Sequence, residues 1–272
     1  WDLQTRTLVR QFYPPANTPQ VAISPDGSRI VAGDVNGGLW LYPAAGGAPQ
    51  VLQPAGAVAT SLTFSDSGDT LAAGLANGTV RFWVKNGPSW RADSLKAHAG
   101  AVTALAFSSD GRWLLSGSAD HSARLWRTDG WQLYRSLLGH GAEVHSVGFD
   151  LKNEVLLTAA ADGTVRRWPL ASPYPQRLLR TQFPVEQVGF SPDGQWLLGA
   201  EGSEVLVWST RNFEPQAPYL GHSTQVRLLQ FSPDNQHVAT SDASDWVNVW
   251  TLTGVARKTS TQVKHLFDLR WS

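Results

Sequence analysis

The sequence contains no cysteine, which excludes disulfide bonds, zinc–thiolate sites and cysteine nucleophiles but leaves the cellular compartment open. It also contains no methionine, so Trp1 is not a translation start, and we expect the chain to be a piece of a longer protein or a processed or excised segment. Neither sign of charge prevails, because 22 Lys and Arg residues balance 22 Asp and Glu residues. A neutral chain has no global field that attracts nucleic acid or an anionic membrane, and we expect neither as a partner.

Long apolar runs are missing as well, and none approaches about 20 residues, the length that spans a membrane. Hydrophobic residues nevertheless make up 42% of the 272 residues, while charged residues make up 16%. This composition is typical of a globular domain that is large enough to bury a sizeable core. We therefore treat residues 1–272 as a single domain.

What the chain does have is one unit that it repeats. Each copy closes on an aromatic residue, and these aromatics recur at intervals of 40 to 43 residues. The copies align as Val21–Tyr42, Ala59–Trp83, Val102–Trp126, Val144–Trp168, Val185–Trp208 and Val226–Trp250. The closing aromatics are Trp1, Tyr42, Trp83, Trp126, Trp168, Trp208 and Trp250, and we expect the six tryptophans in the core.

Each unit reads as short strands joined by turns. In the third copy the runs VTALAF and LLSGS are separated by SSDG, and the matching turns at Ser24 and Ser191 read SPDG. Pro presets the second turn position, and Gly supplies a left-handed residue at the last one, where Asn153 and Asn235 replace it in two copies. The stretch ADGT at Ala161 is a hairpin signal. No helical period of useful length appears, so the sequence predicts an all-β chain.

Four strands in a unit of about 40 residues is the period of a β-propeller blade. The pair Gly-His stands at Gly139 and Gly221, Ala97 replaces Gly in a third copy, and Trp is followed by Asp only at Trp1. On these residues the chain resembles the WD-repeat family of β-propellers, and the resemblance covers essentially its whole length. It implies a ring of four-stranded antiparallel blades, with seven as the favoured number.

The repeat bounds predict blades over residues 21–60, 61–100, 101–143, 144–184, 185–225 and 226–262. A closing seventh blade would combine residues 1–12 with residues 263–272, so that strands from both ends of the chain share one sheet. Such closure removes the exposed strand edges that promote aggregation. Two strands of that blade are missing from this segment, and a six-bladed ring with spare ends is the alternative.

The stretch GSADHSARLW, which begins at Gly117, gathers a carboxylate, a histidine, serines and an arginine and so looks catalytic. The resemblance implies a brace instead, in which a His before the first strand, a Ser or Thr, a turn Asp and a Trp form one buried network. Buried polar groups must satisfy one another, because an unpaired group costs about 1–3 kcal/mol. Two complete sets occur by position: His98, Ser116, Asp120 and Trp126, and His140, Thr158, Asp162 and Trp168.

Two positions near these sets are unusual. His121 stands where other copies have Gly, so we expect it to be a turn residue that faces solvent. The last copy has His222 but places Ser244 where the Asp is expected, so its network is predicted to be doubtful.

No catalytic or metal site stands out in the sequence. The spacing HGAEVH at His140 lies on a loop and a strand, not on the helix that the metalloprotease motif requires, and His140 already belongs to a network. The chain also lacks a nucleophile elbow and a Gly-rich phosphate loop. We predict a protein that is not an enzyme and that uses no cofactor or metal.

In WD-repeat proteins, partners usually contact the propeller face at residues that flank the start of the first strand or precede the turn Asp. Carried over, this rule selects a mixed set of polar side chains, which suggests a protein or peptide partner rather than a polyanion. Ordinary solvated loop tips would look the same. The candidate partner-binding residues are Thr103, Glu143, His145, Glu186, Glu201, Gln225 and Arg227.

These features predict a protein–protein interaction scaffold or sensor domain of a larger protein. The alternative is an enzymatic or substrate-gating propeller that acts on a small molecule or peptide. Arg greatly outnumbers Lys, which with the Ala- and Gly-rich turns favours a bacterial source. Bacterial arrays of this kind often follow an NTPase, protease or kinase domain, so we expect a covalently linked effector domain outside this segment, and a cytoplasmic location.

Overall fold

The computed structural model describes residues 12, 16–150, 152–172, 177–181, 183–211, 222–252 and 257–262. Every regular element within these ranges is a β-strand, which confirms the all-β prediction. The strands form six antiparallel sheets, of which five have four strands and one has three. Strands pair in chain order within each sheet, so every sheet is a series of hairpins.

The first three sheets have four strands each. The first contains β1 (Gln20–Ile23), β2 (Arg29–Gly33), β3 (Leu39–Pro43) and β4 (Gln50–Gln53). The second contains β5 (Ala59–Phe64), β6 (Thr70–Leu75), β7 (Thr79–Asn86) and β8 (Ser89–Lys96). The third contains β9 (Val102–Phe107), β10 (Trp113–Ser118), β11 (Ala123–Arg127) and β12 (Gln132–Leu137).

The last three sheets continue the same order. The fourth contains β13 (Val144–Phe149), β14 (Val155–Ala160), β15 (Thr164–Pro169) and β16 (Arg177–Arg180). The fifth contains β17 (Val185–Phe190), β18 (Trp196–Glu201) and β19 (Glu204–Ser209). The sixth contains β20 (Val226–Phe231), β21 (His237–Asp242), β22 (Trp246–Thr251) and β23 (Arg257–Gln262).

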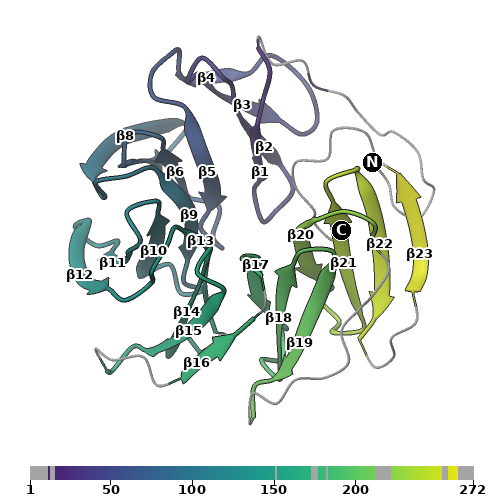
Figure 1. Ribbon diagram of the computed structural model, residues 1–272. Coiled ribbons are helices and arrows are strands. Elements are labelled where there is room, and N and C mark those ends of the chain that lie inside the picture. The colour runs from purple at the N-terminus through teal and green to yellow at the C-terminus, as the bar shows by residue number, and fades with distance from the viewer. Residues whose placement is uncertain are drawn as a thin grey trace.

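The sheets follow one another around a centre as the blades of a β-propeller, from the purple first sheet to the yellow sixth (Figure 1). The first strand of each sheet is innermost, and β1, β5, β9, β13, β17 and β20 contact one another in that order. Fourth strands such as β8 and β12 lie on the outside. This arrangement confirms the predicted propeller fold.

Polar groups join neighbouring innermost strands at intervals of one repeat. Two threonine hydroxyls donate hydrogen bonds to carbonyls of the following blade, and two backbone N–H groups donate to side-chain oxygens of the preceding blade. The donor–acceptor pairs are Thr60–Val102, Thr103–Val144, Val188–Ser146 and Leu229–Gln187. These bonds fix the innermost strands relative to one another along the arc of blades.

The hydrophobic core lies between neighbouring sheets. Val80 and Phe82 of β7 pack with Val102, Leu114 and Trp126 of the third sheet, and all five side chains are buried. Full burial of a large apolar side chain stabilises the fold by about 1.5–3 kcal/mol. The closing tryptophans among the described residues are buried as predicted, and Tyr42 is buried as well; the tryptophans are Trp83, Trp126, Trp168, Trp208 and Trp250.

The turns between first and second strands have the predicted left-handed residue. Gly27, Gly111 and Gly194 have φ angles of 66°, 68° and 68°, and Asn153 and Asn235 both have a φ of 56°. Gly has no Cβ to clash in this conformation, and Asn is among the few other residues that tolerate it. The substitution of Asn for Gly in two copies therefore preserves the same turn.

Some sequence expectations fall outside the described residues. Of the closing blade expected from residues 1–12 and 263–272, only Phe12 is described, and its ring lies 5.4 Å from that of Tyr42. The expected fourth strand of the fifth blade would follow β19, where residues 212–221 lie outside the described ranges. Two boundaries differ, because β1 begins at Gln20 rather than at residue 21, and β5 begins at Ala59 rather than after residue 60.

Within the described part of the chain, no helix has the length and apolar character that crossing a membrane would require.

We predict that Gly78→Ala destabilises the fold more than Gly27→Ala does. Both glycines have positive φ angles, 80° and 66°, so each alanine incurs about 1–2 kcal/mol of backbone strain. A Cβ on Gly78 would also lie 2.3 Å from the carbonyl oxygen of His98, whereas a Cβ on Gly27 meets nothing within 4 Å. Overpacking adds about 1–3 kcal/mol. Urea denaturation measures both losses, and equal losses would contradict the prediction.

Candidate functional site

The imidazole of His98, which precedes β9, is buried in a hydrogen-bonded network. Its Nδ1 lies 3.1 Å from Oδ2 of Asp120 in the β10–β11 turn, and its Nε2 lies 2.7 Å from Oγ of Ser116 in β10. The same Oγ accepts a hydrogen bond of 2.9 Å from the indole Nε1 of Trp126 in β11. The network thus connects the loop before the blade, two strands and a turn.

The fourth sheet repeats this geometry. Nδ1 of His140 lies 3.2 Å from Oδ2 of Asp162, and its Nε2 lies 2.7 Å from Oγ1 of Thr158. Trp168 donates its indole N–H to the same Oγ1 at 2.9 Å. The structure therefore brings together both sets of residues that the resemblance selected by position.

A hydroxyl two residues after each turn Asp completes these networks, and it was not among the residues predicted from the sequence. Oγ of Ser122 donates to Oδ1 of Asp120 at 2.6 Å, and Oγ1 of Thr164 donates to Oδ1 of Asp162 at 2.6 Å. Each hydroxyl also lies 3.1–3.2 Å from Nδ1 of the histidine. The signal was present, since both turns read Asp-x-Ser/Thr.

The sixth sheet has a third complete network, and the doubt based on Ser244 was wrong. Nδ1 of His222 lies 3.0 Å from Oδ2 of Asp242, the last residue of β21, and its Nε2 lies 2.7 Å from Oγ1 of Thr240. Trp250 donates to Thr240 at 2.8 Å, while Ser244 is exposed. Side chains two residues apart at a strand end lie on the same face. Asp242 can therefore take the place of the carboxylate that was expected at position 244.

Burial and hydrogen bonding fix the protonation of these groups. Burial lowers the pKa values of His98 and His140 against the opposing effect of the neighbouring carboxylates, so both rings are neutral at neutral pH. Burial raises the pKa of Asp120, but hydrogen bonds from Ser122 and from the backbone N–H of Ala99 outweigh it and lower the value to about 2. Nδ1 then carries the imidazole proton and donates it to an ionised carboxylate.

The stretch from Gly117 is therefore a structural turn. Ser118 is buried, and its Oγ accepts a hydrogen bond of 3.0 Å from the backbone N–H of Asp120. His121 is exposed with a φ of 67°, which confirms the prediction of a turn residue that faces solvent. The carboxylate of Asp120 is directed to His98, not to an open site.

Five of the seven candidate partner-binding residues lie near one another where β13, β17 and β20 begin, and we call them the polar face cluster: Glu143, His145, Glu186, Gln225 and Arg227. Nδ1 of His145 lies 3.2 Å from Oε2 of Glu186, and its Nε2 lies 4.0 Å from Oε2 of Glu143. Gln225 donates from Nε2 to Oε1 of Glu186 at 2.8 Å. Arg227 is exposed at the start of β20.

The cluster has a defined electrostatic balance. The carboxylate of Glu186 raises the pKa of His145, although burial of the ring acts in the opposite direction. In return, His145 lowers the pKa of Glu186 despite its partial burial, with further help from Gln225 and from the charge of Arg227. Glu186 is therefore held ionised between two groups that carry or can take up positive charge.

The other two candidates have internal roles. The hydroxyl of Thr103 donates to the backbone carbonyl of Val144 in the next blade. Glu201 is only 7% exposed, and its Oε1 accepts a hydrogen bond from the backbone N–H of Phe183. Both side chains join parts of the fold, so the structure does not place them in the polar face cluster.

The spacing HGAEVH does not bring its two histidines to one metal. His140 belongs to the network with Asp162, whereas His145 faces Glu186. Within the residues that the structure describes, no group of three or more His, Cys, Asp or Glu side chains could hold a metal ion.

The fold and the buried networks define a β-propeller of repeated four-stranded blades. The family model for the WD domain, G-beta repeat, matches residues 50–84, 91–127, 131–169 and 213–251, which together make up more than half of the chain. The chain belongs to this WD40 family.

Known proteins with similar sequences also contain such repeats. WD repeat-containing protein 1 of Bos taurus is 29% identical over 140 residues, or 48% of this chain and 23% of that protein. Transcription initiation factor TFIID subunit 5 of Caenorhabditis elegans is 27% identical over 120 residues, or 44% and 18%. Transducin beta-like protein 3 of Rattus norvegicus is 32% identical over 117 residues, or 42% and 15%. The matched regions span less than a quarter of each relative.

We predict that Asp242→Ala lowers the free energy of unfolding by about 1–3 kcal/mol, because it leaves the Nδ1 proton of buried His222 without its acceptor. Asp120→Ala should lower the free energy of unfolding by a similar amount, because it removes the same acceptor from His98. Ser244→Ala is the matched control, and it should change the free energy by less than about 0.5 kcal/mol, as exposed substitutions usually do. Chemical denaturation measures all three, and a larger loss for Ser244→Ala than for Asp242→Ala would contradict the assignment.

We predict that the free energy of unfolding falls as the pH drops below about 6.5, the usual pKa of histidine. The unfolded chain then takes up protons on His98 and His140, whereas the folded chain does not, because burial lowers both pKa values. Each ring contributes a slope of up to about 1.4 kcal/mol per pH unit.

His145 has the opposite effect on stability, because its pKa is higher in the folded protein than in the unfolded chain. Its contribution to stability is fully present below the unfolded-state pKa and is lost as the pH rises through the folded-state pKa. The fall should therefore be steeper in His145→Gln than in the unmodified protein. Denaturation curves between pH 7.5 and about 5.5 measure both slopes. A shallower slope in His145→Gln would contradict the assignment of opposite signs.

Proposed function

We propose that this propeller is a non-catalytic interaction module and that the polar face cluster binds a protein or peptide partner. One observation carries the proposal: polar side chains from three neighbouring blades converge where β13, β17 and β20 begin, with His145 near both carboxylates and Gln225 hydrogen-bonded to Glu186. A site shared by several blades is suited to a protein surface or an extended peptide, because it spans more than one sheet. WD40 proteins generally act as protein-interaction scaffolds.

The charges of the cluster indicate the chemistry of the partner. Glu143 and Glu186 supply carboxylates, Arg227 supplies a cation, and His145 can take up a proton between the two carboxylates. Such mixed charge suits a polar protein segment that offers both donors and acceptors. It does not suit a polyanion such as nucleic acid, and the zero net charge of the chain agrees.

The interaction function is favoured over an enzymatic or substrate-gating propeller. A catalytic site needs reactive groups that converge on one open point. Three of the described histidines are instead engaged in buried networks: His98, His140 and His222. The Caenorhabditis elegans relative is a subunit of a transcription initiation factor, which also supports a role in assemblies.

The finer parts of the proposal concern the setting of the module. We extend it to a scaffold or sensor domain that is covalently linked to an effector domain in a larger, cytoplasmic protein of bacterial origin. The bias of Arg over Lys and the Ala- and Gly-rich turns support the bacterial origin, although the relatives named above are eukaryotic. A sensor role would require that binding at the cluster alters the linked domain.

The test captures partners from lysate of the source cells with three forms of the chain, followed by quantitative mass spectrometry. The forms are the unmodified protein, the double variant Glu143→Gln/Glu186→Gln, and the control Asp129→Asn/Glu154→Gln. The control removes the same charge from exposed residues in turns at the opposite end of the sheets. The face variant should recover the partner about tenfold less, since losing a charged contact costs about 1–3 kcal/mol.

All three forms must first show equal thermal stability. Equal recovery by the face variant and the unmodified protein would overturn the assignment of the binding face. Greater loss with the control variant would move the site to the opposite end of the propeller.

A further inference from the structure

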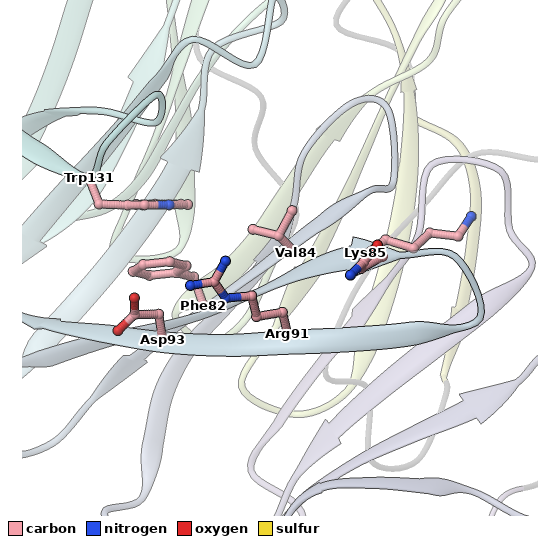
Figure 2. Close-up of a pocket in the computed structure, with 7 residues that line it drawn as sticks. Phe82, Val84, Lys85, Arg91, Asp93 and Trp131 are labelled. Carbon is pink, nitrogen blue, oxygen red and sulfur yellow. The ribbon is translucent and has the colours of Figure 1, made fainter.

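A pocket of about 360 Å³ lies between the second and third sheets on their outer side. β7 and β8 form its floor, and Trp131, which stands between β11 and β12, covers one end (Figure 2). None of its residues belongs to the polar face cluster. The lining residues are Phe82, Val84, Lys85, Asn86, Arg91, Asp93 and Trp131.

Trp131 is held in an unusual backbone conformation at this pocket. Its φ of 53° lies in the left-handed region, which costs an L-residue about 1–2 kcal/mol and which bulky residues rarely adopt. The indole stacks on Phe82 of the neighbouring blade, with ring centroids 3.6 Å apart and planes 16° from parallel. Figure 2 shows the indole lying over the phenyl ring. This stack fixes an aromatic wall at one end of the pocket.

The strand register places charged groups beside that wall. Phe82 lies opposite Asp93 and Val84 lies opposite Arg91 in the β7–β8 hairpin, so these four side chains share one face of the sheet. In Figure 2 the guanidinium of Arg91 reaches between Phe82 and Val84, whereas the carboxylate of Asp93 is turned to the other side. The pocket therefore offers a guanidinium among apolar groups.

Arg91 carries the positive charge that a ligand would meet in the pocket. Among the residues that the structure describes, it has no hydrogen-bond or ion-pair partner. Lys85, the other cation at the pocket, forms an ion pair of 3.6 Å with Asp69 and extends away from the aromatic stack in Figure 2. A polyphosphate ligand would need several free cations, whereas one guanidinium matches one carboxylate in a two-pronged contact.

We infer that this pocket is a second interaction site, which binds an extended peptide segment with an Asp or Glu beside an apolar residue. The carboxylate of the segment pairs with Arg91, and the apolar side chain packs against Trp131 and Phe82. β8 is the outermost strand of its sheet and is eight residues long, so its free edge can pair with an extended segment. The occupant we infer is an extended acidic and apolar segment of a protein partner, and its site shares no residue with the polar face cluster.

The test titrates the isotope-labelled chain with two peptides and follows the side-chain N–H signals of Arg91 and Trp131 by NMR. The peptides are acetyl-Gly-Phe-Asp-Leu-Gly-amide and its counterpart with Asn in place of Asp. The acidic peptide should shift both signals in a saturable way, and the Asn peptide should bind about tenfold more weakly, because a charge-assisted hydrogen bond is worth about 1.5–3 kcal/mol.

Three variants locate the contact. Arg91→Gln should weaken binding of the acidic peptide about tenfold, and Trp131→Gly, which tolerates the left-handed backbone, should weaken it about fivefold. Arg112→Gln is the matched control, because its side chain is 80% exposed at the β9–β10 turn, and it should bind normally. Glu143→Gln/Glu186→Gln should also bind normally, so failure of this site and failure of the proposed function are separate results.

Three outcomes would overturn the inference: equal affinity for the two peptides, unchanged affinity in Arg91→Gln, or no shift of either signal at millimolar peptide. Displacement of the acidic peptide by equimolar inorganic phosphate would also overturn it, since it would show a simple anion site.

Discussion

Apolar side chains of neighbouring sheets cover one another along the described arc of blades, and the rest of the structure depends on this packing. Val80 and Phe82 of the second sheet, for example, are buried against Val102, Leu114 and Trp126 of the third. A sheet on its own would leave such side chains exposed to water, and its burial of apolar surface would not offset the conformational entropy lost on folding. Stability therefore resides in the contacts between adjacent blades, and the hydrogen bonds between innermost strands set how the sheets meet.

His98 and His140 give this apolar framework directional hydrogen bonds, because burial lowers the pKa of each ring and keeps it neutral. A neutral imidazole has one donor and one acceptor, so Nδ1–H of His98 donates to Asp120 while Nε2 accepts from the hydroxyl of Ser116. That hydroxyl then has a lone pair free to accept the indole N–H of Trp126. A charged imidazolium would present two donors, so the Ser116 hydroxyl would have to accept from Nε2 instead of donating to it. The lowered pKa of His98 and the geometry of the network therefore depend on each other. Residue types that serve catalysis elsewhere are here used to hold a blade together.

The sequence predicts the blade well because its signals are local. The left-handed Gly and Asn turns lie within one unit, and the order of His, Ser or Thr, Asp and Trp is contained in less than one repeat length of chain. Predictions fail where neighbouring units meet. Glu201 was predicted to contact a partner, yet it accepts a hydrogen bond from the backbone N–H of Phe183. Asp242 was missed because aligning the repeats by position selects Ser244 and ignores which side chains at the strand end share a face. The stack of Trp131 on Phe82 joins two blades, so no pattern within either repeat reveals the pocket.

The hydrogen bonds between innermost strands have a consequence for how such a protein can change over evolutionary time. Each bond links positions about one repeat apart, so a single unit carries the acceptor or donor for the unit before it and for the unit after it. A gene segment that encodes one whole unit can then be duplicated or deleted, and the units at the new junction still present a donor and an acceptor to each other. A shorter insertion would shift donors away from their acceptors. The geometry thus favours growth or loss of the array in whole units.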